Sequence, residues 1–292
     1  MNDRPDCFIG CPNWGIRAWV GLLFTRDASP ERFLEQYALA FNAVEGNTTF
    51  YGVPAEATVE KWRRQTPPSF RFCFKFPRYI THEARLVGAA DETRAFLSAI
   101  SPLGDRLGPL MLQMPPSFSP ESLGALERYL DGLPADFRYA VEVRNRGYFA
   151  GSGAEALDAA LAERGATRIV FDVRALSAAD PSDRVVREAL RTKPNVPVHL
   201  GPPSATPLVR FVGHPLPAAN RLLLNYWAGA IEEWLAEGRS PHVFVHAPDD
   251  RFAPYLAREL QRAVARRMPT FRVPEWPADT EAPPPEQLGL FD

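Results

Sequence analysis

Short apolar runs alternate with amphipathic stretches along most of the chain. The runs are apolar on both faces, as strands of a buried parallel sheet are, whereas the stretches between them repeat apolar positions at helical spacing. The alternation gives eight strand–helix units. The predicted strands are Phe8–Trp14, Ala43–Phe50, Arg71–Arg78, Pro109–Met114, Tyr139–Asn145, Arg168–Arg174, Pro207–Gly213 and His242–His246. The predicted helices are Glu31–Phe41, Thr58–Gln65, Glu92–Ile100, Pro120–Gly132, Glu155–Arg164, Arg184–Leu190, Ala228–Glu237 and Ala253–Arg267.

Eight such units favour a closed barrel with its helices outside. The alternative is a doubly wound sheet, which usually carries a Gly-x-Gly-x-x-Gly phosphate turn after its first strand. The corresponding segment here is Gly10-Cys11-Pro12-Asn13-Trp14-Gly15, which does not match. We therefore predict a single α/β domain, a (β/α)8 TIM-type barrel over residues 1–274.

Two segments rich in proline fall outside the repeating pattern. Lys193–Pro207 is predicted to be a long irregular loop before the seventh strand. Residues 275–292 are predicted to form a disordered acidic tail, because they combine Pro277 and Pro283-Pro284-Pro285 with five acids and neither Lys nor Arg. Without that tail, 33 basic residues face 30 acidic ones, so the barrel is mildly cationic although the whole chain has a net charge of −2.

Each predicted strand turns polar toward its carboxyl end. Residues two apart share a face of a strand, so Glu45 lies with Asn47 and Glu142 with Arg144. The carboxyl ends of the strands are where barrels of this kind carry their sites. The polar positions at these ends are Asn13, Glu45, Asn47, Lys75, Gln113, Glu142, Arg144, Asp172, Arg174, Arg210 and His246.

Cations are prominent in this set, and guanidinium groups suit phosphate or carboxylate oxygens. We therefore predict an anionic, phosphate-bearing substrate, with nucleic acid as one option. The candidate catalytic residues, which would exchange protons, are Glu45, Lys75, Glu142 and Asp172. The candidate substrate-binding residues are Asn13, Trp14, Asn47, Arg78, Gln113, Arg144, Arg174, Arg210 and His246. The structural alternative is a buried network of ion pairs that closes the mouth of the barrel.

Other chemistries have less support in the sequence. The five histidines show neither His-x-His nor His-Glu-x-x-His spacing, so the cofactor is unknown and a divalent metal stays an open option. There is no serine elbow, P-loop or Cys-x-x-Cys. Three unclustered cysteines, and the lack of a signal peptide or an apolar run of about 20 residues, predict a cytoplasmic protein that does not enter the membrane.

The same residues carry a resemblance to a known family. The matching phrases are Ile9-Gly10 with Trp14, Val44-Glu45-Gly46-Asn47-Thr48-Thr49-Phe50-Tyr51, Trp62 with Thr66-Pro67, Phe74-Lys75-Phe76-Pro77-Arg78, Ile80-Thr81-His82, Gly108-Pro109-Leu110, Gln113-Met114-Pro115-Pro116-Ser117-Phe118, Val141-Glu142-Val143-Arg144 and Val209-Arg210-Phe211. The chain thereby resembles the YecE-like barrels, also called domain of unknown function 72. The resemblance implies a TIM barrel and brings no reaction with it.

Two phrases depart from that family. Many relatives have Arg-Leu-His-Gly in the seventh strand and Phe-Asn-Asn-Asp in the eighth, where this chain has Arg210-Phe211-Val212-Gly213 and His246-Ala247-Pro248-Asp249. No role of the missing histidine and asparagines carries over. The barrel of this family is similar to those of xylose isomerase and endonuclease IV, which suggests sugar isomerisation or phosphodiester cleavage by analogy alone.

The chain ends in Gln287-Leu288-Gly289-Leu290-Phe291-Asp292, which resembles the peptide that bacterial replication and repair proteins use to bind the DNA sliding clamp. Leu288, Leu290 and Phe291 would supply the apolar anchors, and Gln287 would orient the peptide by hydrogen bonds. The alternative is that these residues cover an apolar patch on the protein's own helices.

Three functions follow as hypotheses. The first is an enzyme that acts on a phosphate-bearing substrate and is recruited to DNA by the clamp. The second is a small-molecule enzyme, of the sugar-isomerase or hydrolase kind. The third is a binding module that holds nucleic acid without turnover, in which aromatic residues near the mouth stack on bases.

Overall fold

A computed structural model describes residues 6–281 and contains a closed barrel of eight parallel strands. Each strand coincides with a predicted apolar run, and all but the last end one to four residues before their predicted ends. The strands are β1 (Phe8–Cys11), β2 (Ala43–Gly46), β3 (Arg71–Phe74), β4 (Leu110–Gln113), β5 (Tyr139–Glu142), β6 (Thr167–Asp172), β7 (Leu208–Val212) and β8 (His242–His246). Many of the predicted site residues therefore lie in the first positions of the loops that follow.

The order of the strands confirms the barrel and excludes the doubly wound sheet. β1 pairs with both β2 and β8, and the ladder continues from β8 through β7, β6 and β5 to β4. The barrel closes between β3 and β4, where the amide of Gly108 donates to the carbonyl of Phe72 (2.9 Å) and the amide of Phe76 donates to that of Met111 (3.0 Å).

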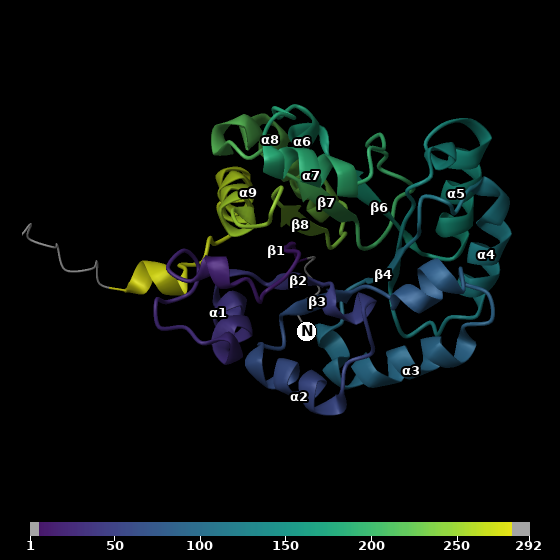
Figure 1. Ribbon diagram of the computed structural model, residues 1–292, viewed down its shortest axis with the longest axis horizontal. Helices are drawn as coiled ribbons and strands as arrows, with labels where there is room; N and C mark the ends of the chain where they lie inside the picture. The colour runs from purple at the N-terminus through teal and green to yellow at the C-terminus, as the bar shows by residue number, and fades with distance from the viewer. Residues whose placement is uncertain (1–5, 282–292) are drawn as a thin grey trace, which may run out of the picture.

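Helices surround the strands, as Figure 1 shows. They are α1 (Phe33–Ala40), α2 (Glu56–Gln65), α3 (Ala90–Ile100), α4 (Leu123–Asp131), α5 (Gly151–Glu163), α6 (Arg174–Ser177), α7 (Arg184–Thr192), α8 (Arg221–Ala236) and α9 (Ala253–Arg267). The sixth unit contains two helices where one was predicted, and α8 begins at Arg221, seven residues before its predicted start. The segment between α7 and β7 is irregular, as expected from its prolines.

The core has two main compartments. The outer one lies between strands and helices and includes Cys7 and Cys11. The inner one fills the barrel with one side chain from each strand: Phe8, Ala43, Cys73, Met111, Ala140, Ile169, Leu208 and Phe244. All three cysteines are buried, and burial raises the pKa of each thiol.

The start of the predicted tail is ordered and packed on the barrel, which corrects the boundary at residue 275. Trp276 is buried beside Phe41, and the guanidinium of Arg258 lies 4.4 Å from its ring centre. Arg258 also pairs with Asp279 at 2.5 Å, within the short helix Pro277–Thr280. The buried indole of Trp276 thus anchors this acidic, proline-rich segment to the barrel. The predicted clamp peptide, residues 287–292, lies outside the described residues.

Among residues 6–281, none of the helices has the length and apolar character needed to cross a bilayer.

Candidate functional site

The layer above the inner core is charged. Since side chains alternate along a strand, the residues two positions beyond the inner core face the same way. At β1 this position is Gly10, and at β6 it is Phe171. The other strands contribute the side chains of Glu45, Lys75, Gln113, Glu142, Arg210 and His246. Five of these six side chains carry or can carry charge, and the residues of all six are less than a tenth exposed.

Arg210 is the centre of this layer. Its Nε and one terminal nitrogen donate to the two carboxylate oxygens of Glu45, at 2.7 and 2.8 Å, and its other terminal nitrogen donates to Glu142. Its guanidinium also lies 5.0 Å from the ring centre of Phe171. Every nitrogen of Arg210 is therefore engaged within the protein, so this residue holds the two acids in place.

Two further cations, Lys75 and Arg144, each pair with one of these two acids. The ammonium of Lys75 lies 3.3 Å from Oε1 of Glu45. The Nε of Arg144, in the loop after β5, donates to Oε1 of Glu142 at 2.7 Å. No described residue accepts a hydrogen bond from the two terminal nitrogens of Arg144.

His246 and Lys193 also lie near these charged residues. The Nε2 of His246 is 3.1 Å from Oε2 of Glu45, and its Nδ1 is 3.8 Å from Asp250. Lys193, which directly follows α7, interacts electrostatically with Asp250, Arg210, Glu45 and Arg144. Burial lowers its pKa. Lys193 was not among the predicted site residues, because nothing in the spacing of its proline-rich loop connects it with the strand ends.

Both buried carboxylates are held in the ionised form. Burial alone would raise their pKa values, but the neighbouring cations outweigh it. Arg210 and Lys75, with a hydrogen bond from His246, hold the pKa of Glu45 well below its usual range, and Arg210, Arg144 and Lys75 lower the pKa of Glu142 to about 2. Such weakly basic carboxylates are poor proton acceptors, so their main contribution here is to orient the cations.

Lys75 is better suited to proton transfer. Burial and the nearby Arg210 lower its pKa from 10.5 to about 8, although Glu45 and Glu142 act in the opposite direction. The neutral imidazole of His82, in the π-helix Tyr79–Glu83, lies on the same side. Burial, Arg144, Arg78 and Lys75 lower the pKa of His82 to about 4. The sequence placed His82 beyond a strand end but did not count it among the site residues.

Asp172 and Arg174 lie apart from this cluster, contrary to expectation. Asp172 accepts hydrogen bonds from Nε of Arg174 (3.0 Å) and from Nε1 of Trp227 on α8 (2.9 Å). It therefore faces the surrounding helices, because Phe171 occupies the axial position of β6. On a strand that is apolar on both faces, the sequence does not show which alternate residues point inward.

Asn13 and Trp14 also serve local structure. The Oδ1 of Asn13 accepts from the amides of Trp14 and Gly15, which closes a turn after β1. The indole of Trp14 packs edge-on against Trp62 of α2, with ring centres 5.5 Å apart. Neither residue is brought to the charged layer by any described contact.

Two amides reach the mouth with an unsatisfied oxygen. Gln113 is 7% exposed, and among the described residues its Oε1 has no hydrogen-bond partner. The Oδ1 of Asn47 also has no hydrogen-bond partner among the described residues, and its Nδ2 donates to the carbonyl of Pro12 at 2.6 Å. Buried polar atoms normally have partners, so these two oxygens mark where a ligand or water would donate hydrogen bonds. Arg78 is exposed and lies beside His82.

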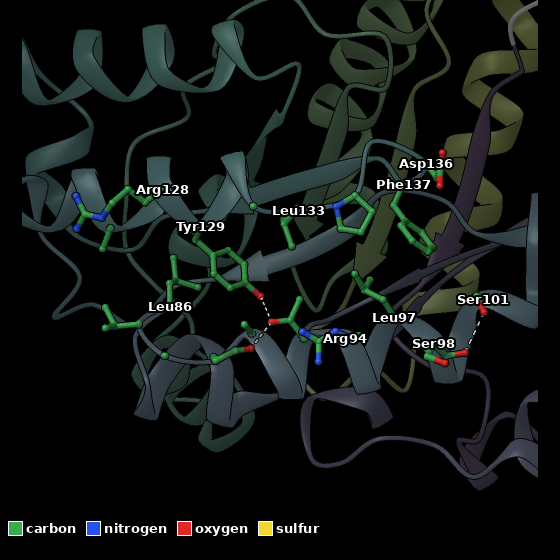
Figure 2. Close-up of a pocket in the computed structure, with 18 residues that line it drawn as sticks. Leu86, Arg94, Leu97, Ser98, Ser101, Arg128, Tyr129, Leu133, Asp136 and Phe137 are labelled. Atoms are coloured by element: carbon green, nitrogen blue, oxygen red, sulfur yellow. Dashed lines mark hydrogen bonds between the residues drawn. The ribbon is translucent and has the colours of Figure 1, made fainter.

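The described residues contain no group of three or more His, Cys, Asp or Glu side chains arranged to hold a metal ion. A more apolar hollow of about 660 Å³ lies away from the mouth, between α3 and α4. The hydroxyl of Tyr129, which Figure 2 shows among the lining residues, lies 2.6 Å from the hydroxyl of Thr93. None of the predicted site residues lines this hollow, so we place the candidate site at the charged mouth.

Solved structures support the fold. A DUF72 family protein from Enterococcus faecalis aligns with a TM-score of 0.68 and 17% identity, over 88% of this chain and 95% of that one. A DUF72 family protein from Thermotoga maritima aligns with a TM-score of 0.66 and 20% identity, over 90% and 99% of the two chains.

Sequence comparison defines the family. The UPF0759 protein YecE of Escherichia coli (strain K12) is 41% identical over 263 residues, which is 90% of this chain and 94% of that protein. The UPF0759 protein YunF of Bacillus subtilis is 27% identical over 150 residues, about half of each chain. The model of the family described as "Protein of unknown function DUF72" matches residues 8–281. The chain thus belongs to the DUF72 family of TIM barrels.

Proposed function

We propose that this protein is an enzyme that binds a phosphate-bearing substrate at the carboxyl-terminal mouth of its barrel. The observation that carries the proposal is the excess of cations around two ionised acids. Lys75, Arg144, Lys193 and Arg210 surround Glu45 and Glu142. Arg210 is fully engaged, whereas Arg144 keeps two donors for an anion. A guanidinium held by a carboxylate on one side suits a phosphate on the other.

Binding of ribose 5-phosphate, followed by calorimetry, tests this proposal. Replacing Arg144 or Lys193 with Gln removes a charged donor and should weaken binding by about 10-fold to 100-fold. Lys61→Gln is the matched control, because Lys61 is exposed on α2. The affinity should also fall as the pH rises through about 8, where the Lys75 ammonium loses its proton. Equal affinities of all variants would refute the phosphate site.

Turnover is a separate measurement. We expect hydrolysis of a chromogenic phosphodiester or phosphomonoester, tested with and without added Mg²⁺ or Mn²⁺. Lys75→Met should abolish this hydrolysis, because Lys75 is a buried group whose pKa is lowered to about 8. Lys61→Gln should retain it. If binding is retained without turnover on any of these compounds, the protein is a binding module and the enzymatic part of the proposal is wrong.

The lowered pKa of Lys75 also favours a second candidate, an isomerase-like enzyme that acts on a small sugar phosphate. A neutral amine next to neutral His82 and His246 would move protons between carbons of such a substrate. Exchange of substrate hydrogens with deuterated water, observed by NMR, distinguishes it from a hydrolase. No exchange with a bound sugar phosphate would remove this candidate.

For the tail, the proposal is recruitment to DNA through the peptide at residues 287–292. Immobilised sliding clamp should retain the full chain and lose the variant Leu290→Ala/Phe291→Ala. Equal retention of the two proteins would exclude clamp binding through these side chains.

A further inference from the structure

A second hollow adjoins the charged mouth beside β2 and β3. It has a volume of about 510 Å³ and is lined by residues that follow these two strands, from the short helix Thr48–Phe50 and from the π-helix Tyr79–Glu83. Phe50 connects the two places. Its ring lines the hollow, and the ammonium of Lys75 lies 6.0 Å from the centre of that ring.

Aromatic side chains line this hollow and are open to solvent. Tyr51 is 84% exposed and Tyr79 is 46% exposed, while Phe50 contacts the rings of Tyr51 and His82 edge-on at 5.4 and 5.2 Å. Large exposed aromatics grouped around one hollow are typical of binding surfaces. A planar ligand ring would stack on them, and each nucleobase presents such a face.

The charges around the hollow differ from those of the mouth. Arg78 lies on its wall together with the carboxylates of Glu83 and Glu92. Two carboxylates would repel a second phosphate, but they accept hydrogen bonds from the amino groups of bases. The chemistry of this hollow therefore complements a base, and the chemistry of the mouth complements a phosphate.

We propose that the hollow holds the base of a nucleotide whose phosphate lies at the mouth, with the sugar passing over Phe50. The nucleotide is either free or part of a single strand. This inference rests on the proposed function, because it takes the phosphate site as given, and it assigns Tyr51 and Tyr79 to base binding.

Calorimetry with AMP and ribose 5-phosphate tests the proposal, since the two ligands differ by the base. Stacking on the aromatic wall should make AMP bind roughly 10-fold tighter. Tyr51→Ala/Tyr79→Ala should lose that preference and keep the affinity for ribose 5-phosphate. Tyr255→Ala, at an exposed position of α9, should behave as the wild type. A 5′-phosphorylated oligodeoxyadenylate that binds tighter than AMP identifies a strand as the ligand, and the reverse order identifies a free nucleotide.

Each failure has its own signature. Equal affinities of the wild type for AMP and ribose 5-phosphate would overturn base binding and leave the phosphate site intact. A preference for AMP that survives in Tyr51→Ala/Tyr79→Ala would overturn the assignment of the hollow. No binding of either ligand would overturn both proposals together. Arg144→Gln, in contrast, should weaken the two ligands alike.

Discussion

Arg210 and Arg144 contact the same carboxylate and have different roles. Arg210 is surrounded by Glu45 and Glu142 and uses all its nitrogens on them. Arg144 uses only Nε, and among the described residues its terminal nitrogens have no hydrogen-bond acceptor. The sequence places both arginines at strand ends but does not separate the two roles, because burial and partner choice depend on neighbours far away in the chain.

Replacing Arg210 with Met should therefore act on stability first. The variant leaves two buried carboxylates without their shared cation, which typically costs about 3–5 kcal/mol of the free energy of unfolding. Urea unfolding measures this loss. Adding Glu45→Gln and Glu142→Gln to the same variant should recover only part of it, because the carboxylates are then neutral but Lys75 and Arg144 lose their partners. A loss below about 1 kcal/mol in the single variant would contradict the role we assign.

Acid should destabilise the protein through its histidines before its carboxylates titrate. The folded-state pKa of His82 is about 4 and its usual value is 6.5, so the unfolded chain binds more protons between these values. Stability should fall as the pH falls from 6.5 to 4. His82→Gln should show a smaller drop in Tm over this interval than the wild type. Parallel curves would mean that His82 is not held neutral by its surroundings.

At the scale of elements, the alternation of apolar runs with helical stretches predicted all eight strands, because strands buried on both faces form nearly continuous apolar runs. Seven of the eight strands end before their predicted ends, because residues such as Asn47, Lys75 and Arg144 lie in the segments that follow the strands. Asp172 was also predicted to lie at the mouth, but its carboxylate contacts Trp227 of α8. Lys193 and the hollow at Tyr51 and Tyr79 belong to loops, whose course the periodicity of the sequence does not determine.

The close approach of β1 and β2 gives an element-scale prediction. A Cβ atom at Gly10 would lie 1.9 Å from the carbonyl oxygen of Ala43 and 2.8 Å from the hydroxyl of Tyr37. That hydroxyl links the two strands by accepting from the amide of Cys11 and donating to Ala43. Gly10→Ala should cost about 1–3 kcal/mol or more by forcing the strands apart.

Gly52→Ala is its control, because a Cβ atom there meets open space. Its midpoint of urea unfolding should match that of the wild type. If the two alanine variants unfold at the same denaturant concentration, the tight contact at Gly10 does not limit the packing of the strands.

Over the whole molecule, the last described segment returns to the start of the barrel. Trp276 packs beside Phe41, and the amide of Ala278 donates to the carbonyl of Leu23 (3.2 Å). Composition alone assigned this segment to the tail, because acids and prolines outweigh a single tryptophan in such a prediction. In the folded protein, the ring of Trp276 is almost fully buried.

Trp276→Ala should lower the free energy of unfolding by about 3–5 kcal/mol, as removal of a buried tryptophan usually does. Glu281→Ala, at the end of the same segment, should cost less than about 1 kcal/mol because its contact with Arg26 is partly exposed. Thermal unfolding of both variants provides the comparison. Similar losses would show that the segment is held by its charges and not by the indole.

The three cysteines lie in different layers of the core, so their thiols can report local opening of each layer to solvent. Cys73 lies inside the barrel, whereas Cys7 and Cys11 lie under the helices. A buried thiol with a raised pKa resists alkylation until solvent reaches it. The alkylation rate of each cysteine, measured by mass spectrometry, would then show whether the interior of the barrel and the layer under its helices open in one event or in two.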